Sequence, residues 1–383
     1  MPWREVDAMS LRSEFVTLAM AEGANIRALC RQSGISAKTG YKWLDRYAAA
    51  GVAGLIDEPR RPGHTPGKTA PELETPVLEV RTAHPAWGGR KIRAVLRRQG
   101  REVVPSARRH GRLVPEECAK HRPWQRFEAP HPNALWQMDF KGHLPLAAGG
   151  RCHPLTVLDD HSRFALAIRA CPDERGETVR RMLIPVFEQY GLPEWILADN
   201  GGPWGSHALH LHTSLTVWCL RLDIGVTHGR PYHPQTQGKD ERFHRTLVDE
   251  LVRQEQLADL EGSQCLFDRW RIQYNLERPH EALDDAVPAS RYHASPRPYP
   301  RQLPQIEYGP DQIVRKVQDK GQAHYYGYIL RVSDAFRGYP VALCLTATDG
   351  VLDIYFCRHP IGQVDLRDAT PGSTCVTYVP EHL

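Results

Sequence analysis

Hydrophobic positions in the first 56 residues recur with the spacing of α-helices. Three helices are predicted, over residues 10–22, from about Ile26, and from Ala37 to about Ala50. In the turn before the last helix, Gly34 supplies a positive φ and Ser36 an N-cap. The apolar faces of the first two helices are formed by Leu11, Phe15, Leu18 and Ala19 and by Ile26, Leu29 and Cys30. This pattern predicts a small all-α domain over residues 1–56.

The helical periodicity stops after this domain and then returns. Residues 57–70 are rich in Pro and Gly with basic residues between them, which is typical of a linker. Helical patterns follow at residues 71–82 and 89–99. We assign them to a second helical region over residues 71–125.

Near residue 130 the pattern changes to short β-rich runs that alternate with helical segments. The last of these helices starts near Glu241, and Phe243, Leu247 and Leu251 recur in it every fourth residue. The order is three strands, a helix, a strand, a helix, a strand and a helix, at residues 135–140, 155–158, 164–168, 178–190, 195–198, 206–222, 226–228 and from about 241. A mixed α/β sheet with helices packed on it is therefore predicted over residues 130–292.

The final part of the chain is predicted to be β-structure. Residues 293–319 include a Pro-rich run and are predicted to be a linker. Asp349-Gly350 lies between two β-rich runs, as in a tight hairpin. Strands are predicted at residues 325–332, 341–347, 351–356 and 363–366. We expect a small β-barrel in residues 320–383, so the chain as a whole is predicted to be multidomain.

Composition narrows the class of protein. With 41% hydrophobic and 25% charged residues in 383, the chain is an ordinary globular protein. No apolar run approaches the length of a membrane span, and charges occur throughout the first 20 residues, so neither a membrane partner nor a signal peptide is expected. The nine cysteines are scattered and never spaced C-x-x-C. Reduced thiols in the cytoplasm fit this usage better than a disulfide framework.

Charge is distributed unevenly along the chain. Residues 1–130 hold 23 Lys+Arg against 14 Asp+Glu, a net of +9, whereas the remainder holds 26 against 31, a net of −5. From Arg90 to Arg112 there are nine basic residues and one acid, Glu102. A basic front half favours a polyanion-binding module, although a solvated surface gives the same balance. The density between Arg90 and Arg112 favours a second DNA-contacting helical unit.

The first three helices match a DNA-binding pattern. A short Gly turn followed by a helix with polar and basic side chains is typical of a helix-turn-helix, whose last helix enters the major groove. A plain three-helix bundle fits the same periodicity. Gly40 departs from the pattern, since it weakens the third helix by about 1 kcal/mol relative to Ala. Candidate DNA contacts in the two helical regions are Lys38, Thr39, Lys42, Arg46, Arg90 and Lys91.

Three acids occupy places where the predicted sheet can bring them together. Asp139 and Asp199 lie in or after the first and fourth strands, which would be adjacent, and Glu241 lies in the first turn of the last helix. A charge in a central strand is costly to bury unless it is paired or metal-bound. Three carboxylates suit Mg²⁺ or Mn²⁺, and two such ions support phosphodiester displacement. The competing acids are Asp159 and Asp160 above all, then Asp240, Asp249 and Glu250.

Several motifs carry a family resemblance. They are W-Q-M-D-F (136–140), T-V-L-D-D-H-S-R (156–163), A-D-N-G (198–201), H-G-R-P-Y-H-P-Q-T-Q-G-K-D-E-R-F-H-R-T-L (228–247) and Y-N-L-E-R-P-H-E-A-L (274–283), with G-I-S-A-K-T-G-Y-K-W-L (34–44) and H-P-A-W-G-G-R-K-I-R (84–93) in the front part. By these motifs the chain resembles bacterial insertion-sequence DDE transposases with a retroviral-integrase-type core of the ribonuclease-H-like superfamily.

The resemblance implies both a site and an activity. Asp139, Asp199 and Glu241 would be the catalytic, metal-binding triad, with Mg²⁺ or Mn²⁺, in two ions, as the cofactor. Family members cut double-stranded DNA at the element's ends and join the freed 3′-hydroxyls to target DNA. A homo-oligomer, at least a dimer, that binds the terminal inverted repeats is expected. Such a protein would be cytoplasmic and nucleoid-associated through its DNA.

Polar residues around the triad are further candidates. Those expected to contact DNA are Tyr232, Gln235, Gln237, Lys239 and Arg245, with ordinary loop polarity and surface charge as the alternative. His233 is not expected to be a general base, because metal-activated oxygen needs none. The segment Arg278-Pro279-His280 is expected to fix the helix after the core rather than to perform chemistry.

The sequence also departs from the family. The 42 positions from Asp199 to Glu241 exceed the usual spacing, and the zinc-binding domain of retroviral integrases is absent. The segment after Gly100 looks shortened, because relatives carry a helix between its P-S and its R-R-H-G. A nuclease on the same core, or a decayed transposase that acts only as a helix-turn-helix DNA-binding protein, therefore remains an alternative.

Overall fold

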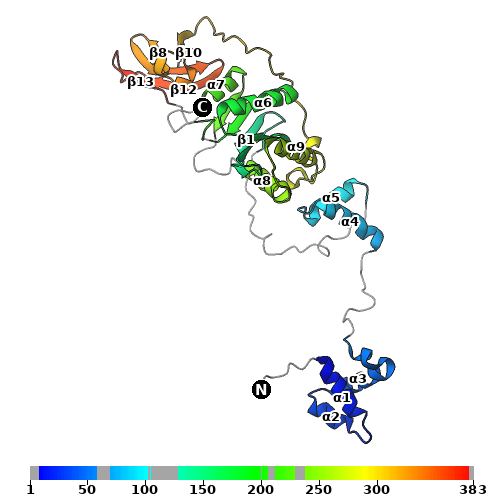
Figure 1. Ribbon diagram of the computed structural model, residues 1–383. Helices are drawn as coiled ribbons and strands as arrows, with labels where there is room; N and C mark the ends of the chain where they lie inside the picture. The colour runs from blue at the N-terminus through cyan, green and yellow to red at the C-terminus, as the bar shows by residue number, and fades with distance from the viewer. Residues whose placement is uncertain are drawn as a thin grey trace. The chain divides into compact units, whose positions relative to one another are not determined.

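The computed structural model describes residues 8–57, 70–101, 104, 128–199, 201–205, 212–228 and 238–378. Its chain divides into two compact units, residues 1–68 and residues 69–383. Figure 1 shows the helices and strands within each unit. In the described ranges no helix has both the length and the apolar character needed to cross a bilayer.

The first unit is a small helical domain. Ser36 caps α3 by accepting a hydrogen bond from the Thr39 amide, and Gly34 has a φ of +66°, as predicted. A Cβ on Gly40 would lie 2.3 Å from the Cys30 sulfur, so glycine is required where α3 packs on its neighbours. The elements are α1 (Ala8–Ala19), α2 (Ile26–Gln32), α3 (Ala37–Ala50) and the 3₁₀ turn η1 (Gly51–Leu55).

One prediction for this unit is wrong. Leu11 and Leu18 were expected on the buried face of the first helix, but they are 53% and 50% exposed. The helix instead buries two consecutive residues, Phe15 and Val16, because it packs on its neighbours over a narrow stripe.

The second unit begins with two helices, α4 (Pro71–Ala83) and α5 (Gly89–Arg98). They pack on each other through a small apolar cluster made of Val77, Trp87, Ile92 and Leu96. Ile92 and Leu96 are four residues apart and so lie on one face of α5, which leaves its basic residues on the other faces.

Among the described residues, the central sheet has six strands in the order β2-β3-β1-β5-β6, with β4 paired to β3. The pairs β1–β3 and β3–β4 are antiparallel, whereas β1–β5 and β5–β6 are parallel. This confirms the predicted mixed sheet and the contact between the first and fourth predicted strands. The strands are β1 (Leu135–Phe140), β2 (Leu144–Pro145), β3 (Arg151–Asp159), β4 (Ala165–Cys171), β5 (Trp195–Ala198) and β6 (Gly225–His228).

Helices cover both faces of this sheet (Figure 1). One face packs against α6 and α7 and the other against α8 and α9, each through its own apolar cluster. Of the helical pattern predicted at 206–222, residues 206–211 lie outside the described ranges. The helices are α6 (Gly176–Tyr190), α7 (Ser214–Arg221), α8 (Gly238–Leu247), which continues into the π-helical turn η5 (Val248–Val252), and α9 (Leu260–Leu276), followed by the short turns η6 (Glu281–Leu283) and η7 (Pro288–Ser290).

The predicted C-terminal β-barrel is wrong, since the described residues form two sheets and no closed barrel. One sheet has the order β12-β11-β10-β7 and the other β13-β9-β8. Between β7 and β8 the chain turns through Lys320 and Gly321, both with positive φ, so β8 leaves the first sheet instead of pairing with β7. The bounds are β7 (Ile313–Lys316), η8 (Asp319–Gly321), β8 (Gln322–Tyr325), β9 (Tyr328–Arg331), η9 (Asp334–Phe336), β10 (Pro340–Leu345), β11 (Val351–Phe356), β12 (His359–Asp365) and β13 (Thr374–Val376).

Two details of this region differ from the expectation. The segment predicted as one strand at 325–332 contains a turn at Tyr326 and Gly327, both with positive φ, so it contributes to two strands. Strand β7 lies inside the range 293–319 that was predicted to be a linker. Val217 and Leu220 of α7 belong to the apolar cluster of the β-sheets, so this region packs directly on the central domain.

Candidate active site

The site lies where strand β1 packs against helix α8. Met138 points into the apolar cluster with α6 and α7, and the alternation of strand side chains sends Asp139 to the opposite face. There the Asp139 side chain is 28% exposed, and Nδ1 of His244 lies 3.8 Å from its Oδ2. Burial first, and then the charge of Asp199, raise the pKa of Asp139 to about 6. The charge of Lys141 opposes this shift only in part.

Asp199 follows β5 and meets Asp139 because the two strands are parallel neighbours that end at the same edge. Its Oδ1 is buried and has no hydrogen-bond partner in the described part of the chain. Burial raises the pKa of this carboxyl group as well. His228 on β6 donates a hydrogen bond from Nδ1 to the Asp199 carbonyl, at 2.8 Å, and so holds the backbone at the strand end.

Helix α8 brings two consecutive acids to this edge, and they differ sharply. Asp240 is 2% exposed, and burial, followed by the charges of Asp139 and Asp160, raises its pKa well above the usual value. Glu241, the predicted third ligand, is exposed in the first turn of α8. The structure thus brings Asp199 and Asp240 each near Asp139 and leaves Glu241 at the surface. No group of three metal-ligating side chains is found within the described residues.

The donor chemistry nevertheless fits a hard divalent cation. Asp139 and Asp199 offer carboxylate oxygens, one of them buried and unpartnered, and each carries a raised pKa. Such oxygens are the ligands that Mg²⁺ and Mn²⁺ prefer. A bound cation would remove the charge repulsion that now destabilises the ionised pair.

His244 was not among the predicted site residues. It lies one turn after Glu241 on α8, is 7% exposed, and has Nε2 2.8 Å from the Thr156 hydroxyl. That hydroxyl also donates to the Asp139 carbonyl, at 3.0 Å. Burial lowers the pKa of His244 to about 4, so the ring is neutral at pH 7. The spacing of three residues from Glu241 was the sequence signal for this position.

Glu174 is a second site residue that the sequence did not reveal. It follows β4 in the connection to α6, and its charge raises the pKa of both Asp139 and Asp199. His153 holds its carboxylate, with Nδ1 2.8 Å from Oε1. No periodicity or motif marks Glu174, because its position depends on how this connection folds back toward the sheet edge.

The competing acids Asp159 and Asp160 have structural roles. Asp159 accepts hydrogen bonds from the Asn133 amide (2.7 Å) and from the amide and hydroxyl of Ser162 (2.8 and 2.5 Å). Asp160 accepts from the Ala129 amide (2.7 Å), Gln137 Nε2 (2.6 Å) and Lys239 Nζ (2.5 Å). Both are fully buried, and every partner is a donor from the protein.

Asp249 and Glu250 also have partners, whereas Oδ1 of Asp240 is buried and has no hydrogen-bond partner in the described part of the chain. Asp249 pairs with Arg253, and Glu250 accepts Arg278 Nε at 2.9 Å. His280 contacts Tyr274 edge-to-face, with ring centroids 4.6 Å apart. The segment Arg278-Pro279-His280 therefore anchors the end of α9, as expected.

The predicted DNA contacts are distributed over several environments. Lys38 and Lys42 are exposed on α3, whereas Thr39 and Arg46 are half-buried, and Lys42 and Arg46 both lie over the Trp43 ring. On α8, Arg245 is exposed and Lys239 pairs with Asp160. On α5, Arg90 and Lys91 pair with acids of the same unit. Outside the described residues lie Tyr232, Gln235 and Gln237, as well as His233.

Comparisons with known proteins agree with this architecture. Two family descriptions named "Integrase core domain" match residues 129–234 and 222–288. In the front part, a helix-turn-helix domain matches residues 12–63 and a homeodomain-like domain residues 39–114. The C-terminal domain of the IS481 family of transposases matches residues 312–372.

Individual relatives come from insertion elements. An uncharacterized 39.2 kDa protein of insertion element IS476 from Xanthomonas euvesicatoria is 26% identical over 257 residues, 64% of this chain and 72% of that protein. A 31.7 kDa protein of insertion element IS407 from Burkholderia multivorans is 27% identical over 158 residues, 41% of this chain and 54% of that protein. The chain thus covers only about half of the second relative.

Among solved structures, the catalytic core domain of HTLV-2 integrase in complex with magnesium is 16% identical and has a TM-score of 0.34. It covers 43% of this chain and 100% of the integrase core. Because the TM-score is below 0.5, the assignment depends on the family and sequence matches rather than on this likeness. By those matches, the chain contains an integrase core domain and is similar to proteins of bacterial insertion elements.

Proposed function

We propose that the protein is a metal-dependent DNA transposase that binds the terminal inverted repeats of its element, cuts at the ends and joins the 3′-hydroxyls to target DNA. The observation that carries this proposal is the pair Asp139 and Asp199 at one sheet edge, both with raised pKa values and one with a buried, unpartnered oxygen. A divalent cation would relieve the repulsion between the two carboxylates and give the unpartnered oxygen a ligand.

In this mechanism Asp139, Asp199 and Glu241 would hold two divalent ions, Mg²⁺ or Mn²⁺. When bound, such ions activate the attacking oxygen and stabilise the leaving oxygen of an in-line displacement. The chain's own task is to hold the two strand-end carboxylates side by side on a rigid sheet. Arg245, which is exposed one turn after Glu241, would contact a DNA phosphate.

Binding of DNA would use the front half of the chain. The helix-turn-helix presents Lys38 and Lys42 at the surface of α3, with Thr39 and Arg46 beside them. Tyr232, Gln235 and Gln237 remain proposed contacts near the reacting phosphate. Synapsis of two element ends would require at least a dimer.

The test is joining of a pre-cut 3′ end to a target duplex by the full chain in Mg²⁺ or Mn²⁺. We expect Glu241→Gln to abolish joining while duplex binding is retained. Asp240→Asn is the matched variant, because it removes the neighbouring acid on the same helix turn. Loss of joining in Asp240→Asn with normal joining in Glu241→Gln would show that the third ligand is Asp240.

The same assay separates the alternatives. Cutting without joining would indicate a nuclease. End binding without either reaction, in the presence of intact inverted repeats, would indicate a DNA-binding protein that has lost catalysis.

A further inference from the structure

Helix α5 carries basic residues on two different faces. Arg93 and Arg97 are exposed. Arg90, Lys91 and Arg98 instead contact the domain that carries the active site. Such a division is not expected of a helix whose cations all serve DNA, so the second face requires its own explanation.

The inner part of this contact is a buried charge cluster around Glu250. Lys91 Nζ lies 3.2 Å and Arg278 Nε 2.9 Å from the same oxygen, Glu250 Oε1. The Glu250 and Arg278 side chains are 8% and 11% exposed, and the Lys91 side chain 26%. Breaking a buried ion pair leaves an uncompensated charge, so this cluster is a stable anchor.

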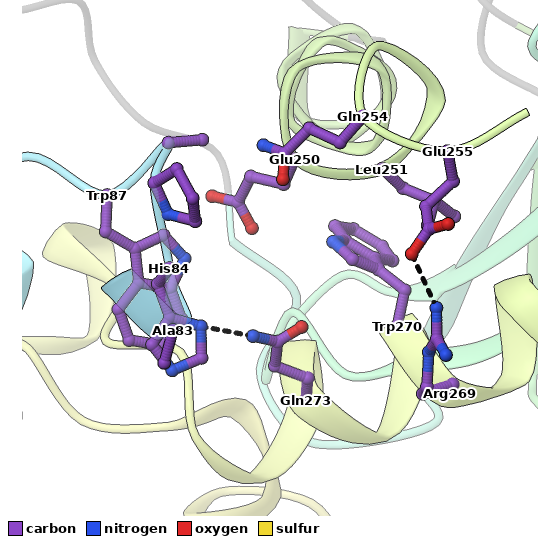
Figure 2. A pocket seen from close by; sticks show the side chains of 12 residues that line it. Ala83, His84, Trp87, Glu250, Leu251, Gln254, Glu255, Arg269, Trp270 and Gln273 are labelled. Atoms are coloured by element: carbon purple, nitrogen blue, oxygen red, sulfur yellow. Dashed lines mark hydrogen bonds and ion pairs between the residues drawn. The ribbon is translucent and has the colours of Figure 1, made fainter. Parts of the chain in front are cut away.

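Aromatic and amide groups extend the anchor. A cavity of about 210 Å³ lies at this contact. Figure 2 shows His84 and Trp87 at its left, Trp270 of α9 at its right, Gln273 of α9 below and Glu250 above. His84 stacks on Trp87 with ring centroids 3.7 Å apart and is hydrogen-bonded to Gln273. Trp87 and Trp270 are both buried, so the connection from α4 to α5 is held against α9 and η5.

The outer part of the contact is of a different kind. Arg90 Nη1 lies 2.6 Å from Glu281 Oε1, and its Nε lies 3.3 Å from Asp285 Oδ1. These side chains are 55%, 63% and 34% exposed. Exposed ion pairs are weak and are screened by salt. Arg90 can therefore exchange one polyanionic partner for another while Glu250 keeps the helix in place.

We propose that Glu281 and Asp285 form a docking surface that occupies Arg90 in the DNA-free protein, and that the phosphate backbone of duplex DNA displaces them. The proposal rests on the DNA-binding function proposed above. Two carboxylates flanking one guanidinium offer the charge of neighbouring phosphates, and DNA gains additional free energy from counterion release. Glu281 and Asp285 then weaken DNA binding at this face of α5, because a duplex must displace them from Arg90 before it can bind there.

The test is the affinity of the full-length Glu281→Gln/Asp285→Asn variant for a duplex, titrated from 50 to 200 mM NaCl. We expect Kd at 50 mM to fall about 3- to 10-fold and the slope of log Kd against log salt to steepen by about 1, the value for one added phosphate contact. Glu188→Gln/Glu307→Gln is the matched control. It removes two exposed acids for which no ion pair is found within the described residues, and we expect the wild-type slope.

A cycle with Arg90 sharpens the result. Arg90→Gln in the wild-type background should change Kd less than 2-fold, whereas in the Glu281→Gln/Asp285→Asn background it should cancel the gain. If the Glu281→Gln/Asp285→Asn variant and the Glu188→Gln/Glu307→Gln control had equal affinity and equal slope, the proposed docking surface would be overturned, but not the DNA-binding function. Absence of duplex binding by every variant, wild type included, would overturn the DNA-binding function and this proposal with it.

Discussion

Two pairs of aspartates in the central domain have opposite surroundings. Asp159 and Asp160 end β3, are fully buried, and each accepts three hydrogen bonds from protein donors. Asp139 and Asp199 lie at the ends of neighbouring parallel strands, and their surroundings raise both pKa values. A buried acid that accepts three hydrogen bonds from protein donors holds the fold together, whereas an acid with a buried oxygen that lacks a partner, such as Asp199, is arranged for a ligand that is itself positive.

The largest expected effect tests the second pair. Asp139→Asn and Asp199→Asn should each reduce 3′-end joining on the order of 10³-fold, since the divalent ions supply several kcal/mol of transition-state stabilisation. Because the mutations also remove charge repulsion, the metal-free variants should unfold at the same temperature as wild type or higher. Joining assays and thermal melts in EDTA check this. An unfolding temperature far below that of wild type would show that these acids stabilise the fold instead of serving a ligand.

The reverse behaviour is expected for the first pair. Asp160→Asn breaks the buried contact with Lys239 and should lower the free energy of unfolding by about 3 kcal/mol. Denaturant titration measures this effect. Asp160→Asn/Lys239→Met should recover part of the loss, because no unpaired cation is then left. If Asp160→Asn instead stopped joining without loss of stability, the contrast between the pairs would fail.

A smaller effect is expected at His244. His244→Gln keeps a polar atom near Thr156 and loses the one near Asp139, and we expect Mn²⁺ affinity to fall about 10- to 100-fold, as for other groups that orient a metal ligand. His244→Asn keeps a polar atom near Nδ1 and should retain more of the affinity. Mn²⁺ titration by calorimetry separates the two. Equal affinity in both variants would mean that His244 only fills space.

The smallest effect is a dependence of metal-free stability on pH. The pKa of Asp139 is about 6 in the folded chain against an ordinary value of 3.8, so the folded state binds more protons between these values. Stability should therefore fall as pH rises from about 4 to about 6. Denaturation in EDTA across this range measures the slope. Subtracting the profile of Asp139→Asn isolates the contribution of this group, and an unchanged slope in the variant would contradict it.

The sheet and its two strand-end acids could be predicted from the sequence because both depend on short-range patterns. Alternation in residues 135–140 placed Asp139 opposite Met138, and the strand order placed Asp199 beside it. The sequence could not predict that Asp240 is buried and Glu241 exposed. A rotation of α8 about its axis by one residue decides which of the two acids is buried. Gly40 is explained by the closeness of the Cys30 sulfur and the Phe15 ring, which the sequence does not show. The partners of Arg90 and Lys91 are 159 to 195 residues away along the chain, and charge counts cannot identify them.

The prediction of a closed barrel was wrong for a related reason. Strand lengths and hairpin signals were nearly correct, but closure depends on backbone turns such as the one at Lys320 and Gly321. A lysine with positive φ has no sequence signature that distinguishes it from other loop lysines.

The packing of α7 has a practical consequence for anyone who wishes to isolate the catalytic domain. Val217 and Leu220 are covered by the C-terminal sheets, so a polypeptide stopped before Ile313 would present both side chains to water. Such a truncated protein should self-associate through the exposed apolar side chains. A fragment meant for spectroscopy or crystallography should therefore extend at least through residue 378.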